Sequence, residues 1–504
     1  MKNILLLYPK VPDNFWTMKQ LIKLMGKKST YPPLGLLTVA SLLPKEWKVD
    51  LIDLNIAELR ESELEKYDFV FISAMNVQSV SVREVIRKCK DNSKTIVAGG
   101  TLFTHQYDEF PEVDHFVLNE AEITLPEFLT DLQNNNLKRI YQTDKFANVK
   151  ETPIPDWKLI NMHEYAYAIV QYSRGCPYLC DFCDVTALFG REPRVKTSKQ
   201  IISELDEILR NGKPEMILFA DDNLIGNKVA LKKDLLPALI DWRSKNKFAP
   251  GFATQVTVNI ADDNNLIELM LDAGFRHLFI GIETPDEKSL FESRKKQNLK
   301  RNLIDNISFL QNKGFIITGG FIVGFDSEDE SIFTKQERLI EETGIIIATI
   351  NVLKAPPGTE LHKRMKQENR LIESFDFNEN ETNILLKMDK KVFRNGYRNL
   401  LENVYSSKNV FNRVKRLIGS DYKTNVKYPI RKKISLDDFL TFFRSVWVVG
   451  ISSKQRKFFW KLLAYTLSTK PKRIMNAFLF SILIYQFNDL REQFLDGNKF
   501  QKKI

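Results

Sequence analysis

The stretch Ser173-Arg174-Gly175-Cys176-Pro177-Tyr178-Leu179-Cys180-Asp181-Phe182-Cys183 places three cysteines within eight residues. The chain has one further cysteine, Cys89, which lies in a helical pattern far from this stretch. Three thiolates on a tight loop can hold three corners of a four-iron cluster, and cluster sites commonly recruit a fourth cysteine. A missing fourth ligand leaves one iron open, which is typical of catalytic rather than structural metal sites. The spacing therefore favours a catalytic iron–sulfur site.

Two other interpretations of the cysteines stay open. Zinc would need four ligands, often including histidine, and the nearest histidine, His163, is not in a knuckle with the cysteines. Alternatively, the three cysteines are unrelated core residues, which their density disfavours. The chain is long and its first residues show no secretory leader, so we expect a reducing cytoplasm, where clustered cysteines favour metal over disulfides.

The cysteines follow the first of six predicted strands that alternate with helices. Six βα units are fewer than the eight of a full TIM barrel, so residues 161–370 are predicted to form a partial (β/α)6 TIM-like barrel with chemistry at the carboxyl ends of its strands. The predicted strands are residues 166–172, 216–220, 252–258, 277–282, 317–323 and 346–353, and predicted helices include 198–210, 264–273 and 300–313.

Residues 1–135 show a second alternation of short apolar strands with helices, which predicts a Rossmann-like α/β domain with a parallel sheet. A ligand of such a sheet would bind at the carboxyl ends of the strands. No Gly-x-Gly-x-x-Gly pattern is present, and Gly99-Gly100 marks either such a site or a simple turn. The predicted strands are residues 4–8, 49–54, 69–73, 95–98 and 115–118. Residues 136–160 are predicted to be a linker, and 371–504 a basic, mainly helical domain.

Composition separates the last domain from the rest. With 43% hydrophobic and 27% charged residues the chain is typical of globular proteins. From residue 391 onward 24 Lys or Arg residues stand against 7 Asp or Glu residues, whereas the whole chain has a net charge of only +10. The basic character is thus local, and we expect no nucleic-acid partner.

The basic clusters 431–433, 454–457 and 470–473 flank apolar runs such as 474–487, and this run is too short to span a bilayer. Two interpretations remain: peripheral contact with an anionic membrane, or a buried helix with solvated charged flanks.

The pattern Cys-x3-Cys-x-aromatic-Cys after the first strand of a partial barrel resembles the signature of radical S-adenosylmethionine (SAM) enzymes. Residues 31–37, Tyr-Pro-Pro-Leu-Gly-Leu-Leu, are similar to the N-terminal pattern of cobalamin-dependent radical SAM proteins. The last domain resembles an uncharacterised C-terminal domain of one subgroup, similar in layout to hopanoid C-methylases. This resemblance implies a 4Fe–4S cluster, SAM and cobalamin as cofactors.

The resemblance also implies roles for individual residues. Cys176, Cys180 and Cys183 would ligate the cluster. The SAM-binding candidates, each with a structural alternative, are Phe182 near the adenine (or loop packing), Asp222 and Asn223 on the methionine amino group (or helix capping), Glu283 on the ribose or amino group (or a cap or an ion pair), and Gly324 at the end of an adenine-binding strand (or tight barrel packing). The cobalamin candidates, all at predicted strand ends, are Ser73, Met75, Gln78, Gly99 and Gly100.

By resemblance, the enzyme would cleave SAM to a 5′-deoxyadenosyl radical and carry out cobalamin-dependent C-methylation of an unactivated carbon in a lipid or other secondary metabolite. The Asp-x-His-x-x-Gly motif of other cobalamin proteins is absent, and His105 and His115 fit no such pattern. One alternative is a radical SAM enzyme that performs ring formation, coupling or rearrangement, and a remote one is a zinc-stabilised binding protein. A reduced flavodoxin or ferredoxin-type protein would supply electrons, and we expect a cytoplasmic enzyme with peripheral membrane contact.

Overall fold

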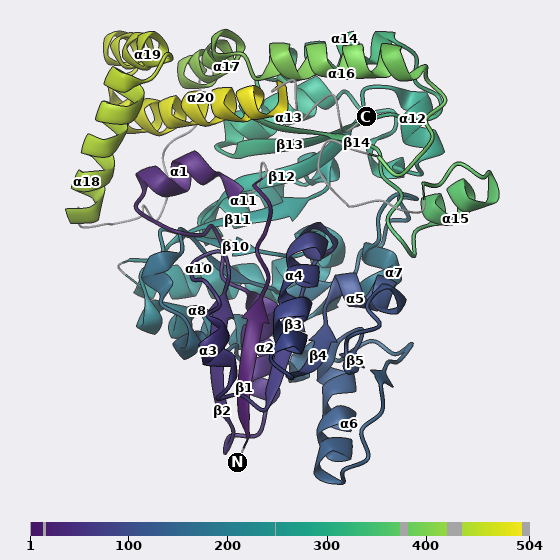
Figure 1. Ribbon diagram of the computed structural model, residues 1–504. Coiled ribbons are helices and arrows are strands. Elements are labelled where there is room, and N and C mark those ends of the chain that lie inside the picture. Colours follow the sequence, from purple (N-terminus) through teal and green to yellow (C-terminus); the bar gives the residue numbers. More distant parts are fainter. Residues whose placement is uncertain (1, 14–16, 247, 373–381, 421–435, 496–504) are drawn as a thin grey trace.

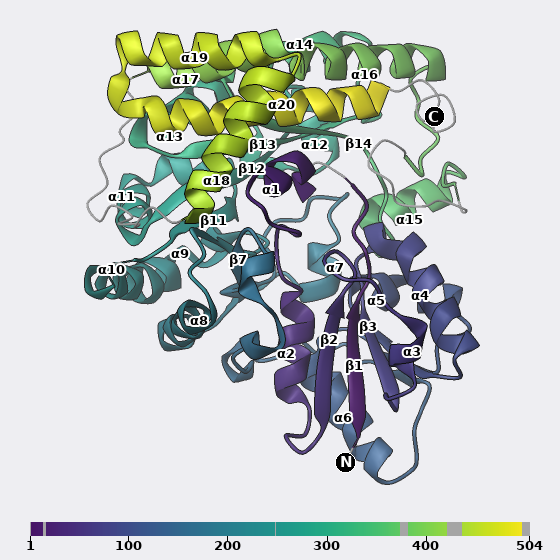
Figure 2. The same cartoon turned by 60° about the vertical axis from the view of Figure 1, so that its left-hand side comes forward.

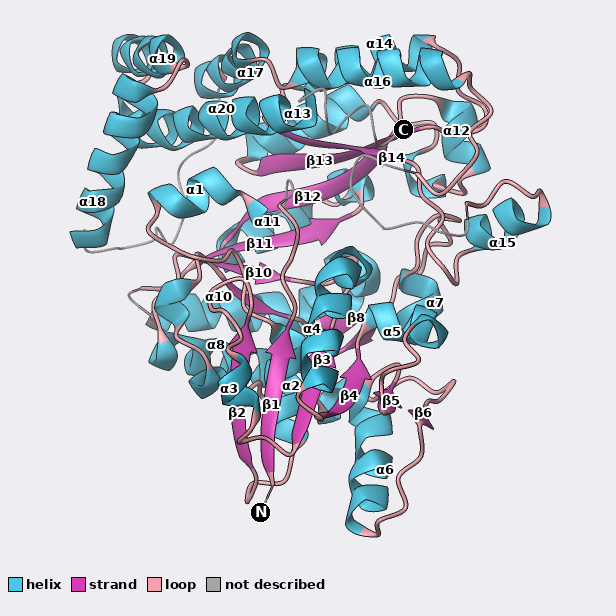
Figure 3. Cartoon of the chain, viewed as in Figure 1, coloured by secondary structure: helices cyan, strands magenta, loops and turns pink. Residues whose placement is uncertain are grey.

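The computed structural model describes residues 2–13, 17–246, 248–372, 382–420 and 436–495. Two parallel sheets, each of six strands, dominate the molecule, and a layer of helices from the C-terminal part of the chain covers one side of the second sheet (Figure 1). The arrowheads of the first sheet point toward the second sheet (Figure 3). The carboxyl ends of the N-terminal strands, where α/β sheets bind ligands, therefore face the rest of the protein.

The N-terminal sheet has the strand order β2-β1-β3-β4-β5-β6. Its strands are β1 (Asn3–Tyr8), β2 (Lys48–Asp53), β3 (Phe69–Ser73), β4 (Thr95–Gly99), β5 (His115–Val117) and β6 (Ile140–Tyr141). The five predicted strands are present within one or two residues. The sixth, β6, lies in the predicted linker, and the sequence did not indicate it because two residues carry no alternation.

Helices cover both faces of this sheet, as the alternation in β1 requires. Ile4 and Leu6 face a core shared with α2 (Leu34–Leu42) and α6 (Ala121–Gln133). Their neighbours Leu5 and Leu7 face a separate core shared with α4 (Ser79–Asp91) and α5 (Thr101–Gln106). Cys89 is buried within α4, in the second of these cores.

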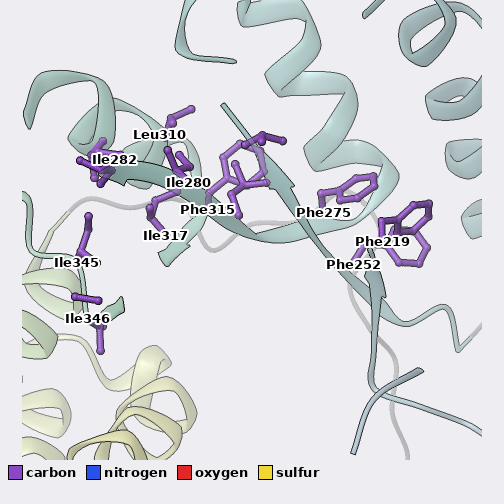
Figure 4. Packing of buried hydrophobic residues seen from close by; sticks show 14 of the residues in the cluster. Phe219, Phe252, Phe275, Ile280, Ile282, Leu310, Phe315, Ile317, Ile345 and Ile346 are labelled. Carbon is purple, nitrogen blue, oxygen red and sulfur yellow. The ribbon is translucent and has the colours of Figure 1, made fainter. Parts of the chain in front are cut away.

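The second sheet is the predicted partial barrel, with the strand order β7-β10-β11-β12-β13-β14. Its strands are β7 (Ala168–Val170), β10 (Met216–Phe219), β11 (Gly251–Val256), β12 (Phe275–Glu283), β13 (Ile316–Val323) and β14 (Ile347–Val352). Helices α8 (Ser198–Asn211), α10 (Leu236–Lys245), α11 (Asn264–Ala273), α13 (Leu303–Lys313) and α14 (Ser331–Thr343) connect them. Aromatic and β-branched side chains such as Phe219, Phe252, Phe275, Ile280 and Ile317 fill the core (Figure 4).

The C-terminal helices protect the edge of the barrel. They are α15 (Glu360–Gln367), α16 (Lys390–Val404), α17 (Ser407–Gly419), α18 (Leu436–Ser445), α19 (Arg456–Thr469) and α20 (Ile474–Leu495). In α16 and just after it, Tyr397 and Tyr405 donate hydrogen bonds to the carbonyls of Ile350 and Ala348 on the edge strand β14. An otherwise open strand edge is thereby capped by side chains.

The apolar run 474–487 lies within α20 and is mostly buried. Ala477, Phe480, Ile484 and Phe487 belong to the same core as the barrel strands, which corresponds to the buried-helix interpretation. Among the described residues, no helix combines the length and apolarity needed to cross a membrane. The basic cluster 431–433 lies outside the described residues.

Candidate functional site

The cysteine loop leaves the barrel at the carboxyl end of β7 and begins with a short antiparallel hairpin, β8 (Ser173–Arg174) with β9 (Arg194–Val195). Gly175 has a φ of +97°, and a Cβ there would lie 2.8 Å from the carbonyl oxygen of Glu192. Only glycine tolerates this conformation and close approach without strain. The backbone N–H of Cys176 then donates to the carbonyl of Gly190 at 3.2 Å. The position of the first cysteine is thus fixed by backbone contacts.

Two aspartates that follow β10 hold the start of the loop. Asp221 is fully buried and accepts hydrogen bonds from the Tyr172 N–H at 3.3 Å and the Ser173 hydroxyl at 2.5 Å. Asp222 accepts from the Gly175 N–H at 3.2 Å. Burial raises the pKa of Asp221 to about 7 and that of Asp222 to about 6. Both carboxyls therefore position the cysteine loop, and contact of Asp222 with the methionine amino group of SAM stays a prediction.

The three thiols are held in a partly buried environment. Burial raises the pKa of Cys176, Cys180 and Cys183, and the Lys295 ammonium opposes this effect at each. The Gln297 amide donates to the Cys180 sulfur at 3.6 Å. In the described part of the chain no three His, Cys, Asp or Glu side chains converge as ligands of a single metal ion would. Thiolate is the form that binds metal, so a cationic neighbour is chemically suited to this loop.

Glu283 ends β12 in a left-handed conformation with a φ of +66°, where the register with β13 shifts. Its Oε1 accepts from the Lys295 Nζ at 2.6 Å, and both side chains are only 9% exposed. A Cβ on Gly281 would lie 2.9 Å from the same Nζ, so glycine makes room for the pair. Gln336 and Asn298 fix the surrounding carbonyls by donating to Glu283 and Gly281, each at 3.0 Å. Of the predicted alternatives for Glu283, the ion pair is formed.

Lys295 and Gln297 are residues that the sequence analysis missed, because neither belongs to a motif or follows a strand. Lys295 also lies 6.0 Å from the centre of the Phe182 ring, which packs edge-on against Phe325 at 6.2 Å. Gly324, beside Phe325, has a φ of +109°, and a Cβ added there would come no closer than 3.4 Å to its neighbours, so the backbone conformation rather than close packing favours glycine. The structure thus gathers Phe182, Glu283 and Gly324 around the cysteine loop.

Two buried polar atoms at this site have no partner, which tests whether the site suits a polar ligand. They are Nδ2 of Asn223, which follows Asp222 after β10, and Oε1 of Gln297, whose amide donates to the Cys180 sulfur. Buried polar groups are normally paired, and an unpaired one is costly. A ligand with amino, carboxylate and hydroxyl groups would satisfy them, so the residues fit SAM.

Helix α15 also binds the cysteine loop. The Leu361 N–H donates to the Asp181 carbonyl at 2.8 Å, and the Arg364 guanidinium lies 3.2 Å from the Asp181 carboxyl. Burial raises the pKa of Asp181 to about 6, against the opposing effect of Arg364. Sequence reasoning did not include α15 in the site, because the contact bridges more than 180 residues.

The cysteine loop also contacts the N-terminal sheet. Arg174 bridges Glu120 and Glu122, with 2.7 Å between its Nη1 and Nη2 atoms and the respective carboxylate oxygens. Arg194 pairs with Glu120 at 2.9 Å. These glutamates follow β5, at the carboxyl edge of the sheet. Burial opposes ionisation of Glu122, yet Arg174 lowers its pKa below the usual value. A buried ion network therefore joins the two strand-end regions.

The cobalamin candidates lie at that same edge. Gly100 has a φ of +90°, and a Cβ there would lie 2.9 Å from the Ser73 hydroxyl and 2.8 Å from a backbone oxygen of the β3 loop. Gln78 is buried and accepts from the Met75 N–H at 2.8 Å, while Met75 itself is 42% exposed. Gly99 packs against β5, where a Cβ would lie 2.7 Å from the Val117 carbonyl oxygen. The glycines therefore serve tight packing in the turn, and Met75 is left at the surface.

Two buried atoms at the carboxyl edge have no partner: Asn76 Oδ1 and His105 Nε2. His105 lies in α5, where burial lowers its pKa, and it approaches Asp184 next to the cysteine loop and Gly358. Figure 2 shows α5 beside α7 (Val185–Phe189), which follows the cysteines. An edge with unpaired polar atoms and an exposed apolar side chain fits a large amide-bearing ligand such as cobalamin.

A parallel sheet that presents its carboxyl edge to a partial barrel with a three-cysteine loop defines a cobalamin-binding radical SAM architecture. Three family models match the chain in this order: B12 binding domain at residues 27–129, radical SAM superfamily at 170–335, and a domain of unknown function (DUF4070) at 359–499.

Relatives agree with this order. An uncharacterized methyltransferase of Synechocystis sp. is 38% identical over 76% of this chain and 71% of its own length. The hopanoid C-2 methylase of Rhodopseudomonas palustris is 30% identical over 91% of this chain and 88% of its own length. The chain belongs to the same family of cobalamin-binding radical SAM proteins, as the sequence predicted.

Solved structures show the same fold. The cobalamin-dependent SAM radical enzyme OxsB matches with a TM-score of 0.61 at 17% identity, over 99% of this chain and 81% of that protein. The radical SAM methyltransferase TsrM from Kitasatospora setae matches with a TM-score of 0.58 at 14% identity, over 73% and 76%. The predicted fold class, enzyme class and cofactors (a 4Fe–4S cluster, SAM and cobalamin) are confirmed. As a radical SAM enzyme the protein needs a small-molecule substrate and a reductant.

Proposed function

We propose that this enzyme transfers a methyl group to an unactivated carbon of a lipid or other apolar secondary metabolite, with cobalamin as the methyl carrier. The observation that carries the proposal is the buried network of Arg174 with Glu120 and Glu122, which ties the cysteine loop to the carboxyl edge of the N-terminal sheet. A methyl carrier and a radical source must both reach one substrate. Because the network joins the cysteine loop to the carboxyl edge of the N-terminal sheet, it supports a common space between the cluster site and the cobalamin site. The activity of the hopanoid C-2 methylase supports a polycyclic lipid as the substrate class.

The protein's own residues would contribute binding, orientation and charge. When bound, the cluster and SAM would supply one-electron cleavage of a carbon–sulfur bond, and cobalamin would supply a transferable methyl group. Cys176, Cys180 and Cys183 would hold three irons and leave the fourth for SAM. Lys295 would offset the negative charge of the thiolates, since a buried cation is stabilised by a nearby anion. Asp222 would keep the loop in place through the Gly175 N–H.

The SAM and cobalamin contacts belong to the same proposal. Phe182, Asn223, Glu283 and Gly324 would contact SAM, with the unpaired Asn223 Nδ2 as the strongest single support. For the corrin edge the support is the exposure of Met75 beside Ser73, Gln78, Gly99 and Gly100. A reduced flavodoxin or ferredoxin-type protein would be the electron donor.

The test is anaerobic reconstitution with iron, sulfide and hydroxocobalamin, followed by desalting and incubation with a reductant, a hopanoid-type lipid and SAM carrying a deuterated methyl group. We expect iron, sulfide and cobalamin to stay bound, 5′-deoxyadenosine to form, and the lipid to gain a deuterated methyl group. Cys183→Ala should lose the cluster, whereas the matched Cys89→Ala change in α4 should keep it. Cluster and 5′-deoxyadenosine without bound cobalamin would instead favour ring formation, coupling or rearrangement.

A further inference from the structure

The C-terminal helices expose a row of large apolar side chains. Along α18 and the π-helical segment Val446–Ser452, the side chains of Phe439, Phe443, Trp447 and Ile451 follow one another every four residues and therefore share one helix face. They are 56%, 57%, 63% and 47% exposed, respectively. Large apolar side chains exposed in such a row are unusual on a monomer and mark an interaction site.

Neighbouring residues extend this row into a ridge. Trp460 in α19 is half exposed and donates through Nε1 to the Gly450 carbonyl at 2.8 Å, so its ring lies against the π-helical segment. Leu440 lies next to Phe439 and is also exposed. We call this surface the aromatic ridge, and it consists of Phe439, Leu440, Phe443, Trp447, Ile451 and Trp460.

The ridge is not a displaced part of the core, because the same helices bury other side chains. Val449, Phe459 and Phe478 form a packed cluster between α19, α20 and the π-helical segment. Phe442 stacks on Phe478 with ring centres 5.1 Å apart, which anchors α18 by the face beside the ridge. The helices are thus anchored through the face that carries the packed cluster, and the ridge lies on their other, exposed face.

The helices that carry the ridge have a positive net charge. The described segment 436–495 contains nine Lys or Arg residues and four Asp or Glu residues, and no acidic residue lies between Asp438 at the start of α18 and Asp489 in α20. Lys454, Arg456, Lys457 and Lys461 are exposed and follow the ridge in the loop and in the first turns of α19. This excess of positive charge favours an anionic partner, and basic residues beside bulky apolar ones are the pattern of helices that lie on anionic membranes. Tryptophan suits this position because its ring is apolar and its N–H is polar.

We propose that the aromatic ridge docks the enzyme onto an anionic phospholipid bilayer, lying in the headgroup region without crossing it. The surface differs from the run 474–487 that the sequence suggested, because α20 is mostly buried. Docking in this way does not depend on which reaction the enzyme catalyses. It would bring the enzyme to a lipid phase, where a substrate of the proposed class dissolves.

The test is flotation of the full-length protein with vesicles of phosphatidylglycerol and phosphatidylcholine, against vesicles of phosphatidylcholine alone. We expect binding to the anionic vesicles only, weakened by salt. The variant F443S/W447S should bind at least about tenfold less, since two large apolar side chains no longer enter the headgroup region. The control F291S removes a side chain that is 76% exposed in α12 (Glu287–Glu292) and should bind like the wild type.

A second measurement locates the contact. Vesicles with brominated acyl chains should quench the fluorescence of the protein, and W447F should lose about half or more of that quenching while keeping its circular dichroism spectrum. Binding that is unchanged in F443S/W447S would overturn the proposal. So would absence of vesicle binding together with a dimer in light scattering that the same double change dissociates, because the ridge would then be an interface between two copies.

Discussion

The buried pair of Glu283 and Lys295 gives a quantitative prediction. Replacing Lys295 by Met would leave a carboxylate without its partner in a site where both side chains are 9% exposed. Removing one partner of a buried ion pair costs about 3–5 kcal/mol. A change of 1 kcal/mol shifts the midpoint of a domain of 150–250 residues by about 2–4 °C. We therefore expect the thermal midpoint of the cofactor-free protein to fall by at least about 6 °C.

The chain offers a matched control. Lys245 and Asp241 form an ion pair with the same 2.6 Å separation, but their side chains are 70% and 62% exposed. Exposed pairs contribute about 0–1 kcal/mol, so Lys245→Met should shift the midpoint by no more than about 4 °C. The comparison isolates burial, because distance and residue types are nearly the same.

Anaerobic differential scanning calorimetry with a chelator present measures both variants without a contribution from a cluster. Adding Glu283→Gln to Lys295→Met should recover part of the loss, since the double variant buries no net charge. The reasoning is refuted if Lys295→Met and Lys245→Met behave alike, or if the double variant is less stable than Lys295→Met alone.

Three further outcomes are expected. Burial raises the pKa of Glu328 to about 7, so the folded state holds a proton that the unfolded state releases, and stability falls as pH rises from about 4.5 to 7; Glu328→Gln should flatten this dependence in denaturation curves at pH 5 and 8. Cys176→Ala should abolish iron and sulfide retention, measured by metal analysis, while the α4 variant Cys89→Ala should retain both. Gly100→Ala should destabilise the protein by strain at a φ of +90°, whereas Gly35→Ala, in a helix with open space around it, should be neutral or stabilise it by up to about 1 kcal/mol, as chemical denaturation would show.

The sequence predicted most of the fold because strong local signals specify it. Eleven strands were located from apolar runs, and each is present with small shifts at its ends. The three exceptions, β6, β8 and β9, have two residues each, and the pairings of β6 with β5 and of β8 with β9 depend on partners that local pattern does not reveal. The apolar run in α20 was located correctly, but whether its side chains meet a core or a lipid depends on how α17 and α19 pack around it.

The site was predicted where chemistry is local and missed where it depends on contacts between distant segments. The cysteine spacing is visible in eleven consecutive residues. Lys295 is twelve residues from Glu283, and Arg364 is 183 residues from Asp181, so neither partnership has a sequence signature. Asp222 was recognised as a strand-end carboxylate, yet its bond to the Gly175 N–H could be found only in three dimensions.

The cysteine loop explains why so many distant residues are needed. A loop that leaves one iron open cannot be fixed by four metal–thiolate bonds, and between the Ser173–Arg174 hairpin strand and α7 it forms no regular structure whose hydrogen bonds would fix it instead. Its backbone and side chains are therefore bound from outside, by Asp221 and Asp222 after β10, by Glu120 and Glu122 after β5, and by Leu361 in α15. These partners belong to all three matched regions of the chain. The order of the loop, and with it the retention of a cluster, thus depends on the docking of the regions on one another, and this coupling gives the C-terminal region a role at the site through α15.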